Sequence, residues 1–242
     1  MRKTIAVALC VVASSFAAAV HAVAQHPSWA YGFVDPPPAP GAPVPAAAPA
    51  GAAPAPAPDT TPLSVPGSTV KLTRTQANDP YSPADWFPTQ HPAAPEIVLH
   101  GRRDAQINAC GLCHYVAGHG RQENAGIAGL PYDYFVQTMM DFKNDLRHSA
   151  DTRKANTNRM VGFAKAMTEQ EIRDVAKYYS SIPWTQYIRV VETKTVPKTR
   201  MANGMFIKLE GNDTEPLGNR VIESPENFER TEIRDPNSGF VA

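Results

Sequence analysis

The sequence predicts a mainly α-helical domain flanked by a Pro/Ala-rich N-terminal segment and a C-terminal extension of short strands. Three observations lead to this fold class. Apolar residues recur with helical spacing between residues 132 and 179, where a helix-capping motif also occurs. Residues 36–58 consist almost only of Pro, Ala and Gly. Beyond Trp184, short apolar runs alternate with turn residues, which is typical of short strands.

Residues 1–24 have the layout of a secretory signal peptide. A basic start precedes an apolar run from Ile5 to Val20, and small residues follow at Ala22 and Ala24. We therefore expect cleavage after one of these alanines and a periplasmic protein. The alternative is a retained anchor helix, but the run is shorter than the roughly 20 residues that span a bilayer.

Residues 25–93 are predicted to be a linker and a wrapping segment. The stretch 36–58 lacks many backbone donors and cannot bury a core, so it should be extended and polyproline-like. It would act either as a tether or as an unstructured tail. From residue 59 onward the composition shifts to Pro, Ser, Thr and Asp. We expect irregular structure here that wraps onto the domain, with Trp86 and Phe87 as an apolar anchor.

The folded domain is expected over residues 94–183, and it should open with a short helix. Pro95 lies near the start of this helix, a position that proline favours. Gly101, at its end, allows the close approach of another helix. Residues 115–129 are rich in glycine and show neither helical nor strand periodicity, which predicts a loop.

Two longer helices are predicted next, separated by a polar and basic loop over residues 147–159. The first should run from Tyr132 to Leu146, and its apolar residues have spacings of four, three and four: Phe135, Met139, Phe142 and Leu146. The second begins at a capping box formed by Thr168 and Glu171 and should end near Ser181. One face of this second helix should be buried through Ile172, Val175, Ala176 and Tyr179.

Residues 184–242 form the expected C-terminal extension. Short strands are predicted at residues 187–191, 205–209 and 219–222, each bounded by turn residues. Residues 235–239 should be a turn or a tail.

The motif Cys110-Gly111-Leu112-Cys113-His114 carries the chemistry of this chain. Two cysteines three positions apart, followed directly by a histidine, are the signature of covalent haem attachment. Each thiol can add to one vinyl group of a haem, and the adjoining imidazole can reach the iron. We therefore expect one haem c, bound through Cys110 and Cys113, with His114 as an iron ligand. The third cysteine, Cys10, leaves with the signal peptide.

Three other uses of the two thiols stay open. A disulfide is permitted in an exported protein. A zinc site is disfavoured because the motif lacks a second ligand pair downstream. A thioredoxin-like redox pair would need a strand before the motif and a helix after it.

A sixth iron ligand is expected if the protein moves electrons rather than binding gases, and methionine is the usual partner of histidine. Six methionines lie downstream of the motif: Met139, Met140, Met160, Met167, Met201 and Met205. Met139 lies on an apolar helix face, where packing is the simpler role. Met160 is expected to lie in a loop, seven residues before Met167, with no helical face to serve, and a loop methionine can adapt its approach to a metal. Met160 is the predicted ligand, and Met167 is the second choice.

Taken together, these motifs resemble a class I c-type cytochrome, most similar to bacterial cytochromes c whose members often carry two haem domains. The resemblance covers residues 94–183. Its marks are CGLCH at 110–114, IAGLPYDYF at 127–135, DFK at 141–143, RMVGFAKAMTEQEI at 159–172 and AKYY at 176–179.

The resemblance implies that Met160 is the axial ligand, and that the first and last helices cross near Gly101 and Tyr178. It also exposes two departures. Tyr115 stands where a glycine usually follows the histidine, and Ala125 stands where a proline usually offers its carbonyl to the histidine ring. The tail from Trp184 resembles the segment that joins two haem domains.

The resulting hypothesis is a periplasmic electron carrier with His/Met-ligated haem that exchanges electrons with redox partner proteins and is not itself an enzyme. One alternative is an electron-transfer subunit of a periplasmic or membrane-bound dehydrogenase or oxidase complex. Another is a haem peroxidase or gas-binding protein. The chain has 23 basic and 23 acidic residues, which gives no indication of nucleic-acid binding. Basic residues around Met160 could steer an acidic partner: Arg147, Arg153, Lys154, Arg159 and Lys165.

Overall fold

The computed structural model describes residues 60–149, 155–202, 205–218, 221–237 and 240–241. The predicted signal peptide with Cys10 and the proline-rich stretch 36–58 lie outside these ranges. Within the described part of the chain, no helix combines the length and hydrophobicity needed to cross a membrane.

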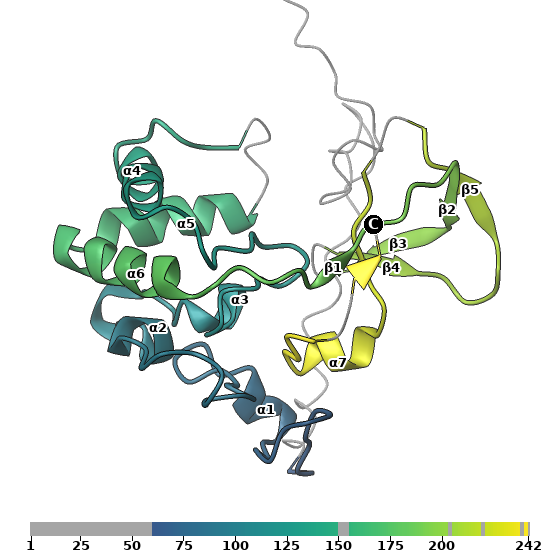
Figure 1. Cartoon of the computed structure of the whole chain (residues 1–242), viewed down its shortest axis with the longest axis horizontal. Coiled ribbons are helices and arrows are strands. Elements are labelled where there is room, and N and C mark those ends of the chain that lie inside the picture. Colours follow the sequence, from purple (N-terminus) through teal and green to yellow (C-terminus); the bar gives the residue numbers. More distant parts are fainter. Residues whose placement is uncertain (1–59, 150–154, 203–204, 219–220, 238–239, 242) are drawn as a thin grey trace, which may run out of the picture.

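A helical domain forms one half of the molecule (Figure 1). In it α4 packs against both α5 and α6, and α2 contacts α6. Its helices are α2 (Glu96–His100), α3 (Gly111–His114), α4 (Tyr132–Lys143), α5 (Ala155–Ala166) and α6 (Glu169–Ser181), with a 3₁₀ turn, η1 (Arg103–Ala105), between α2 and α3. The prediction of a mainly α-helical domain is therefore confirmed.

The predicted capping box of α6 is present. The Thr168 hydroxyl accepts from the Glu171 N–H at 3.1 Å, and the Glu171 carboxylate accepts from the Thr168 N–H at 2.7 Å. The helix ends at Ser181, and its predicted apolar face is buried: Ile172, Val175, Ala176 and Tyr179. These residues join Phe135 and Met139 of α4 in the main core.

The helix α4 begins where Pro131 predicted, but it ends three residues earlier than expected. Asn144 caps it, and Asp145 adopts a positive φ of 58°, which stops the helical path. Leu146 is consequently 73 % exposed and does not extend the apolar face, so that part of the prediction was wrong.

The prediction of a loop over residues 147–159 was also wrong for its last residues, because α5 starts at Ala155. Its first turn is polar, so the apolar face becomes visible only from Met160 onward. Met160, Phe163 and Ala164 follow helical spacing and pack on the main core. Met160 therefore lies within a helix rather than in a loop.

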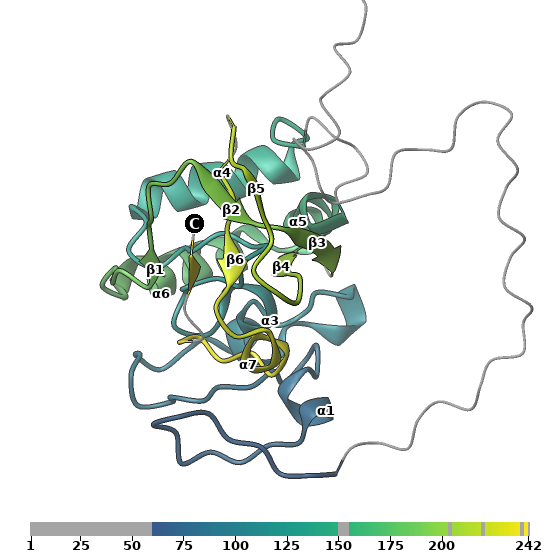
Figure 2. The same cartoon turned by 90° about the vertical axis from the view of Figure 1, so that its right-hand side faces the viewer.

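The C-terminal extension forms a small β lobe beside the helical domain (Figures 1 and 2). Its strands are β1 (Ile188–Arg189), β2 (Thr195–Pro197), β3 (Thr199–Ala202), β4 (Met205–Lys208), β5 (Thr214–Pro216), β6 (Ser224–Pro225) and β7 (Phe240–Val241). They pair in three small sheets, β1-β7-β6, β2-β5 and β3-β4. Two of the predicted strands, β1 and β4, are present. Val221 and Ile222 are not in a strand, contrary to the third prediction.

The N- and C-terminal segments of the described chain meet in a second, smaller core. It contains Val65, Ala77, Ala84, Trp86 and Ile233. The Trp86 indole N–H donates to the Ile233 carbonyl at 2.8 Å. In both views α1 (Arg74–Ala77) and α7 (Phe228–Glu232) lie close together near α3 (Figures 1 and 2). The wrapping segment and its Trp86 anchor were predicted, whereas α7 was not.

Candidate functional site

The Cys-x-x-Cys-His motif forms the short helix α3. Cys110 caps it, and the His114 N–H donates to the Cys110 carbonyl at 3.0 Å. The helix stops at Tyr115, whose φ of 57° and ψ of 156° fall in a region that is essentially reserved for glycine. The Tyr179 hydroxyl donates to the Tyr115 carbonyl, and the Tyr115 ring is buried, so packing holds this strained residue.

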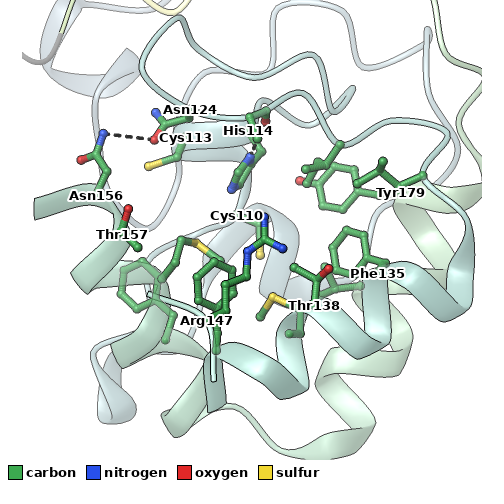
Figure 3. A pocket seen from close by; sticks show the side chains of 18 of the residues that line it. Cys110, Cys113, His114, Asn124, Phe135, Thr138, Arg147, Asn156, Thr157 and Tyr179 are labelled. Atoms are coloured by element: carbon green, nitrogen blue, oxygen red, sulfur yellow. Dashed lines mark hydrogen bonds between the residues drawn. The ribbon is translucent and has the colours of Figure 1, made fainter. Parts of the chain in front are cut away.

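A cavity of about 560 Å³ lies against α3, and its size suits a prosthetic group. Cys110, Cys113 and His114 line it, and Met160 of α5 lines it too. Figure 3 shows His114 pointing into this space beside the two cysteines. All four predicted site residues are therefore brought to one cavity.

The lining is largely apolar, with side chains from α4, α5, α6 and the loops around α3. Its apolar members are Ile107, Ala109, Ile127, Leu130, Phe135, Met139, Phe142, Phe163, Met167 and Val175. Such a lining excludes water and provides a surface on which a flat apolar macrocycle can pack.

The His114 ring is oriented by the backbone. Its Nδ1 lies 2.8 Å from the Ala125 carbonyl oxygen. Because a carbonyl only accepts, Nδ1 must carry the proton, and Nε2 is then the nitrogen that can bind a metal. Desolvation lowers the pKa of His114 below its usual value, while the bond to Ala125 opposes that shift. The imidazole is therefore neutral at neutral pH, which is its metal-binding form.

The loop after α3 is folded so that the Ala125 carbonyl reaches this ring. The Gly120 N–H donates to the His114 carbonyl at 2.9 Å, and the Arg121 N–H donates to the Cys113 carbonyl at 3.0 Å. Gly120 has a φ of 83°, and a Cβ there would lie 2.5 Å from the Ala125 oxygen. The Ala125 backbone carbonyl therefore accepts the hydrogen bond from the His114 ring, although alanine replaces the proline that is usual in class I cytochromes c.

The two cysteines carry free thiols. Burial raises the pKa of Cys110 to about 12, with a smaller contribution from Cys113, and burial also raises the pKa of Cys113. Both groups are thus protonated thiols facing the cavity, which is the form that remains available for thioether bonds. Among the described residues, no group of three or more His, Cys, Asp or Glu side chains is arranged to hold a metal ion.

Three methionines line the cavity: Met139 of α4, Met160 of α5 and Met167, which directly follows α5. Met139 and Met167 are nearly buried and belong to the main core, whereas Met160 packs only at its edge. Packing in the main core explains the positions of Met139 and Met167, whereas Met160 is less involved in that core. Its role as a ligand stays a prediction.

The cavity lining also contains polar residues, and sequence reasoning found only one of them, Arg147. The other polar lining residues are Asn108, Glu123, Asn124, Thr138, His148, Ser149, Asn156 and Thr157. The Asn156 amide donates to Asn124 at 3.3 Å across the two walls (Figure 3). Most of these residues come from predicted loops, and no sequence signal distinguishes them from ordinary surface residues.

The C-terminal extension contacts the back of the motif. The Arg234 guanidinium donates to the Leu112 carbonyl inside α3. Arg121, which follows the motif, pairs with Glu123 at 3.1 Å and with Glu232 of α7 at 2.7 Å. This ionic group is nearly buried, and burial raises the pKa of Glu123 although Arg121 opposes it. The segment predicted as a turn or tail starts at Asp235, which is fully buried.

Comparisons with known proteins agree on one part of the chain. Residues 100–183 match the family model for cytochrome c. A curated relative, cytochrome c4 of Thiocapsa roseopersicina, is 34 % identical over 99 residues, which cover 38 % of this chain and 45 % of the relative. The chain thus spans about half the length of that relative.

Two solved structures are also similar to part of the chain. Reduced recombinant cytochrome c4 from Pseudomonas stutzeri has a TM-score of 0.32 and 22 % identity, covering 36 % of this chain and 45 % of the other. A thiosulfate dehydrogenase from Marichromatium purpuratum has a TM-score of 0.32 and 25 % identity, covering 38 % of this chain and 18 % of the other.

Proposed function

Since the chain contains a class I c-type cytochrome domain, we propose that it is a periplasmic one-electron carrier with a single haem c, ligated by His114 and Met160. The family relationship supports covalently bound haem and electron transfer with redox partner proteins. The count of one haem rests on the single Cys-x-x-Cys-His motif, and the periplasmic location rests on the signal-like residues 1–24.

The observation that supports the proposal best is the shared cavity of Cys110, Cys113, His114 and Met160. Two thiols and a neutral imidazole lie together on α3, and a thioether is offered from α5. This donor set is the one that a covalently attached haem requires. A cavity of about 560 Å³ with a largely apolar lining fits the same group.

When bound, the haem supplies the one-electron couple of its iron. The chain determines how that couple behaves. His114, oriented through Ala125, and Met160 would hold the iron; the imidazole would donate electron density to it, and the thioether would favour its ferrous form. The apolar lining excludes water and so disfavours the extra charge of ferric iron. Arg147, Asn124 and Asn156 also line the cavity and would hold the haem carboxylates.

The surface near Met160 gives limited support for electrostatic steering of a partner. Arg147 and Arg159 are described, but Lys165 is paired with Asp145 at 2.7 Å and its charge is partly compensated. Arg153 and Lys154 lie outside the described residues. We therefore expect a modest dependence of electron-transfer rates on ionic strength.

Absorption spectroscopy tests the proposal. A pyridine haemochrome assay on purified protein should report one haem c per chain. The ferric protein should show the weak band near about 695 nm that is expected of methionine–iron ligation. Met160→Ala should abolish this band, and Met167→Ala, from the buried core, should retain it.

Other outcomes would separate the alternatives. A spectrum that does not change in Met160→Ala would indicate an open distal site, as in a peroxidase or gas-binding protein. Loss of the band in Met167→Ala alone would move the axial ligand to Met167. Purification of the native protein with a dehydrogenase or oxidase would favour the subunit role.

A further inference from the structure

We propose that Tyr187, in the C-terminal extension, is a positioning residue that fixes the hydrogen bond between His114 and Ala125 and thereby lowers the reduction potential of the haem. The inference rests on the proposed function, because it requires His114 to be an iron ligand. Neither the family match, which ends at residue 183, nor the motif includes this tyrosine.

Tyr187 contacts the loop directly beside the accepting carbonyl. The residue after Ala125 is Gly126, and a Cβ on Gly126 would lie 2.2 Å from the Tyr187 hydroxyl oxygen and 2.7 Å from the His119 carbonyl oxygen. The tyrosine therefore rests on the bare backbone of Gly126. Any movement of the Ala125–Gly126 peptide toward the extension is blocked by this contact.

The tyrosine is itself held in place on the other side of the loop. Its ring stacks on the His119 ring, with 4.9 Å between centroids and an angle of 24°. The His119 Nε2 lies 3.2 Å from the Thr185 hydroxyl, a second contact between the loop and the extension. Tyr187 immediately precedes β1, which pairs with β7. The extension thus contacts the loop at both His119 and Gly126, on either side of Ala125 in sequence.

This support matters because the loop has little stiffness of its own. It contains Gly118, Gly120 and Gly126 within nine residues, and glycine loses the most conformational freedom on folding. Ala125 also lacks the ring that would fix its backbone φ in a proline. A rigid acceptor for the histidine must therefore come from packing, and Tyr187 with His119 supplies it.

The expected effect has a definite sign. A short bond from Nδ1–H to the carbonyl increases the basicity of the imidazole, which stabilises ferric iron and lowers the potential. When the acceptor loosens, the imidazole becomes a weaker donor and the potential rises. Tyr187 lies outside the cavity lining, so a change in potential would have to pass through the loop.

The test uses the full-length holoprotein and three variants. Tyr187→Leu removes the stacked ring, Tyr187→Phe retains it, and Tyr132→Leu removes a tyrosine at the start of α4 that is 39 % exposed. Redox titration gives the potential. Proton NMR of the ferrous protein gives the exchange rate of the His114 Nδ1 proton.

We expect Tyr187→Leu to shift the potential to more positive values and to accelerate exchange of the Nδ1 proton. Tyr187→Phe keeps the stacked ring but loses the hydroxyl that contacts Gly126, so it should shift both quantities in the same direction as Tyr187→Leu but less. Tyr132→Leu should change neither quantity. An unchanged potential and exchange rate in Tyr187→Leu would overturn the inference, as would an equal shift in Tyr132→Leu. A wild-type protein without covalent haem or without histidine ligation would instead refute the proposed function.

Discussion

The two sides of the cavity are built in different ways. The histidine side, comprising α3 and the loop to residue 130, depends on backbone hydrogen bonds and on glycines that permit close contact. Segments remote in sequence cover it, including Tyr187 and Arg234 of the extension. The methionine side consists of α4 and α5, which are consecutive in the chain and meet through side-chain packing.

A single lysine illustrates the local character of the methionine side. Lys143, at the end of α4, donates to the carbonyl oxygens of Ala164, Lys165 and Met167 at 3.2, 3.1 and 2.6 Å. It thereby satisfies the C-terminal carbonyls of α5 and places a positive charge at the negative end of the helix dipole.

The difference matches what an imidazole and a thioether would each require as iron ligands. An imidazole ring must be oriented by a second bond, and its acceptor must stay in place. A methionine has three rotatable bonds and can adapt its approach. We infer that the histidine side is the less tolerant of substitution, and the following predictions test that comparison.

The largest loss in the free energy of unfolding is expected at Arg121, where α7 of the extension contacts the loop that follows α3. Arg121→Met removes the cation that pairs with Glu123 and Glu232, whose side chains are 8 % and 26 % exposed. Removal of one partner from a buried ion pair costs about 3–5 kcal/mol, because the remaining charge is left uncompensated. Denaturant titration of the holoprotein should show a loss of this order in the free energy of unfolding.

The matched control is Arg189→Met, which breaks an exposed pair with Glu226 at 3.0 Å in the same extension. Its cost should be about 0–1 kcal/mol. Equal losses in the two variants would mean that the extension contributes no buried ionic contact to the histidine side.

A pair of glycines compares the two sides directly. Gly120 has a φ of 83°, and an added Cβ would meet the backbone of Ala125 and Gly126 within 2.7 Å. Gly120→Ala should therefore cost about 2–3 kcal/mol through strain and displacement of the acceptor. Gly162 lies inside α5, where an added Cβ would meet nothing within 4 Å.

Gly162→Ala should stabilise the protein by about 0.5–1 kcal/mol, because alanine loses less entropy than glycine in a helix. Thermal unfolding of both variants gives the comparison. A destabilising Gly162→Ala, or a neutral Gly120→Ala, would contradict the proposed contrast between the two sides.

The elements that the sequence predicted are those specified by local signals. The capping box at Thr168 and the proline before α4 each act over a few residues, and the structure has the corresponding helices α6 and α4. No helix was predicted at the Cys-x-x-Cys-His motif, which forms α3. The start of α5 was missed because its first turn is polar and its apolar face begins at Met160. Polarity alone therefore does not distinguish a loop from a helix that is solvated on most of its surface.

The contacts of the extension were beyond the reach of sequence reasoning. Arg234 donates a hydrogen bond to the Leu112 carbonyl, 122 residues away in sequence, and Gln122 donates one to the Thr231 hydroxyl, 109 residues away. Neither contact leaves a periodic pattern. Tyr115 offered the only hint, because a tyrosine in place of glycine after the histidine needs something to pack against. The Tyr115 ring is buried, and the positive charges of Arg121 and Arg234 lower the pKa of its hydroxyl against the rise that burial causes. Because Arg234 belongs to the extension, the extension is part of the environment of this tyrosine.

A pH-dependent effect is predicted for His91, which joins the wrapping segment to the histidine side. Its Nε2 lies 3.0 Å from the Asp85 carboxylate and its Nδ1 lies 2.8 Å from the Pro92 carbonyl. Both partners accept, so the ring is best satisfied as a cation. Nδ1 is also 3.1 Å from the Tyr178 hydroxyl, which donates to the Val116 carbonyl.

The hydrogen bond with Asp85 raises the pKa of His91, whereas burial acts in the opposite direction. A folded-state pKa above the unfolded value of about 6.5 means that this stabilisation is complete below about pH 6.5 and is lost as the pH rises through the folded-state pKa. His91→Gln should therefore lower the free energy of unfolding more at about pH 5.5 than at about pH 8.5. The difference should be about 1 kcal/mol, as between a charged and a neutral hydrogen bond.

Denaturant titrations at the two pH values measure this difference, and His100→Gln is the control. The His100 side chain is half exposed and lies 4.0 Å from Glu96, so its replacement should cost less than about 0.5 kcal/mol at both pH values. If His91→Gln cost the same at both pH values, His91 would be a neutral packing residue. The wrapping segment would then be joined to the region around α3 without an ionic contact from His91, through neutral hydrogen bonds such as that from the Ala109 N–H to the Pro80 carbonyl at 2.9 Å.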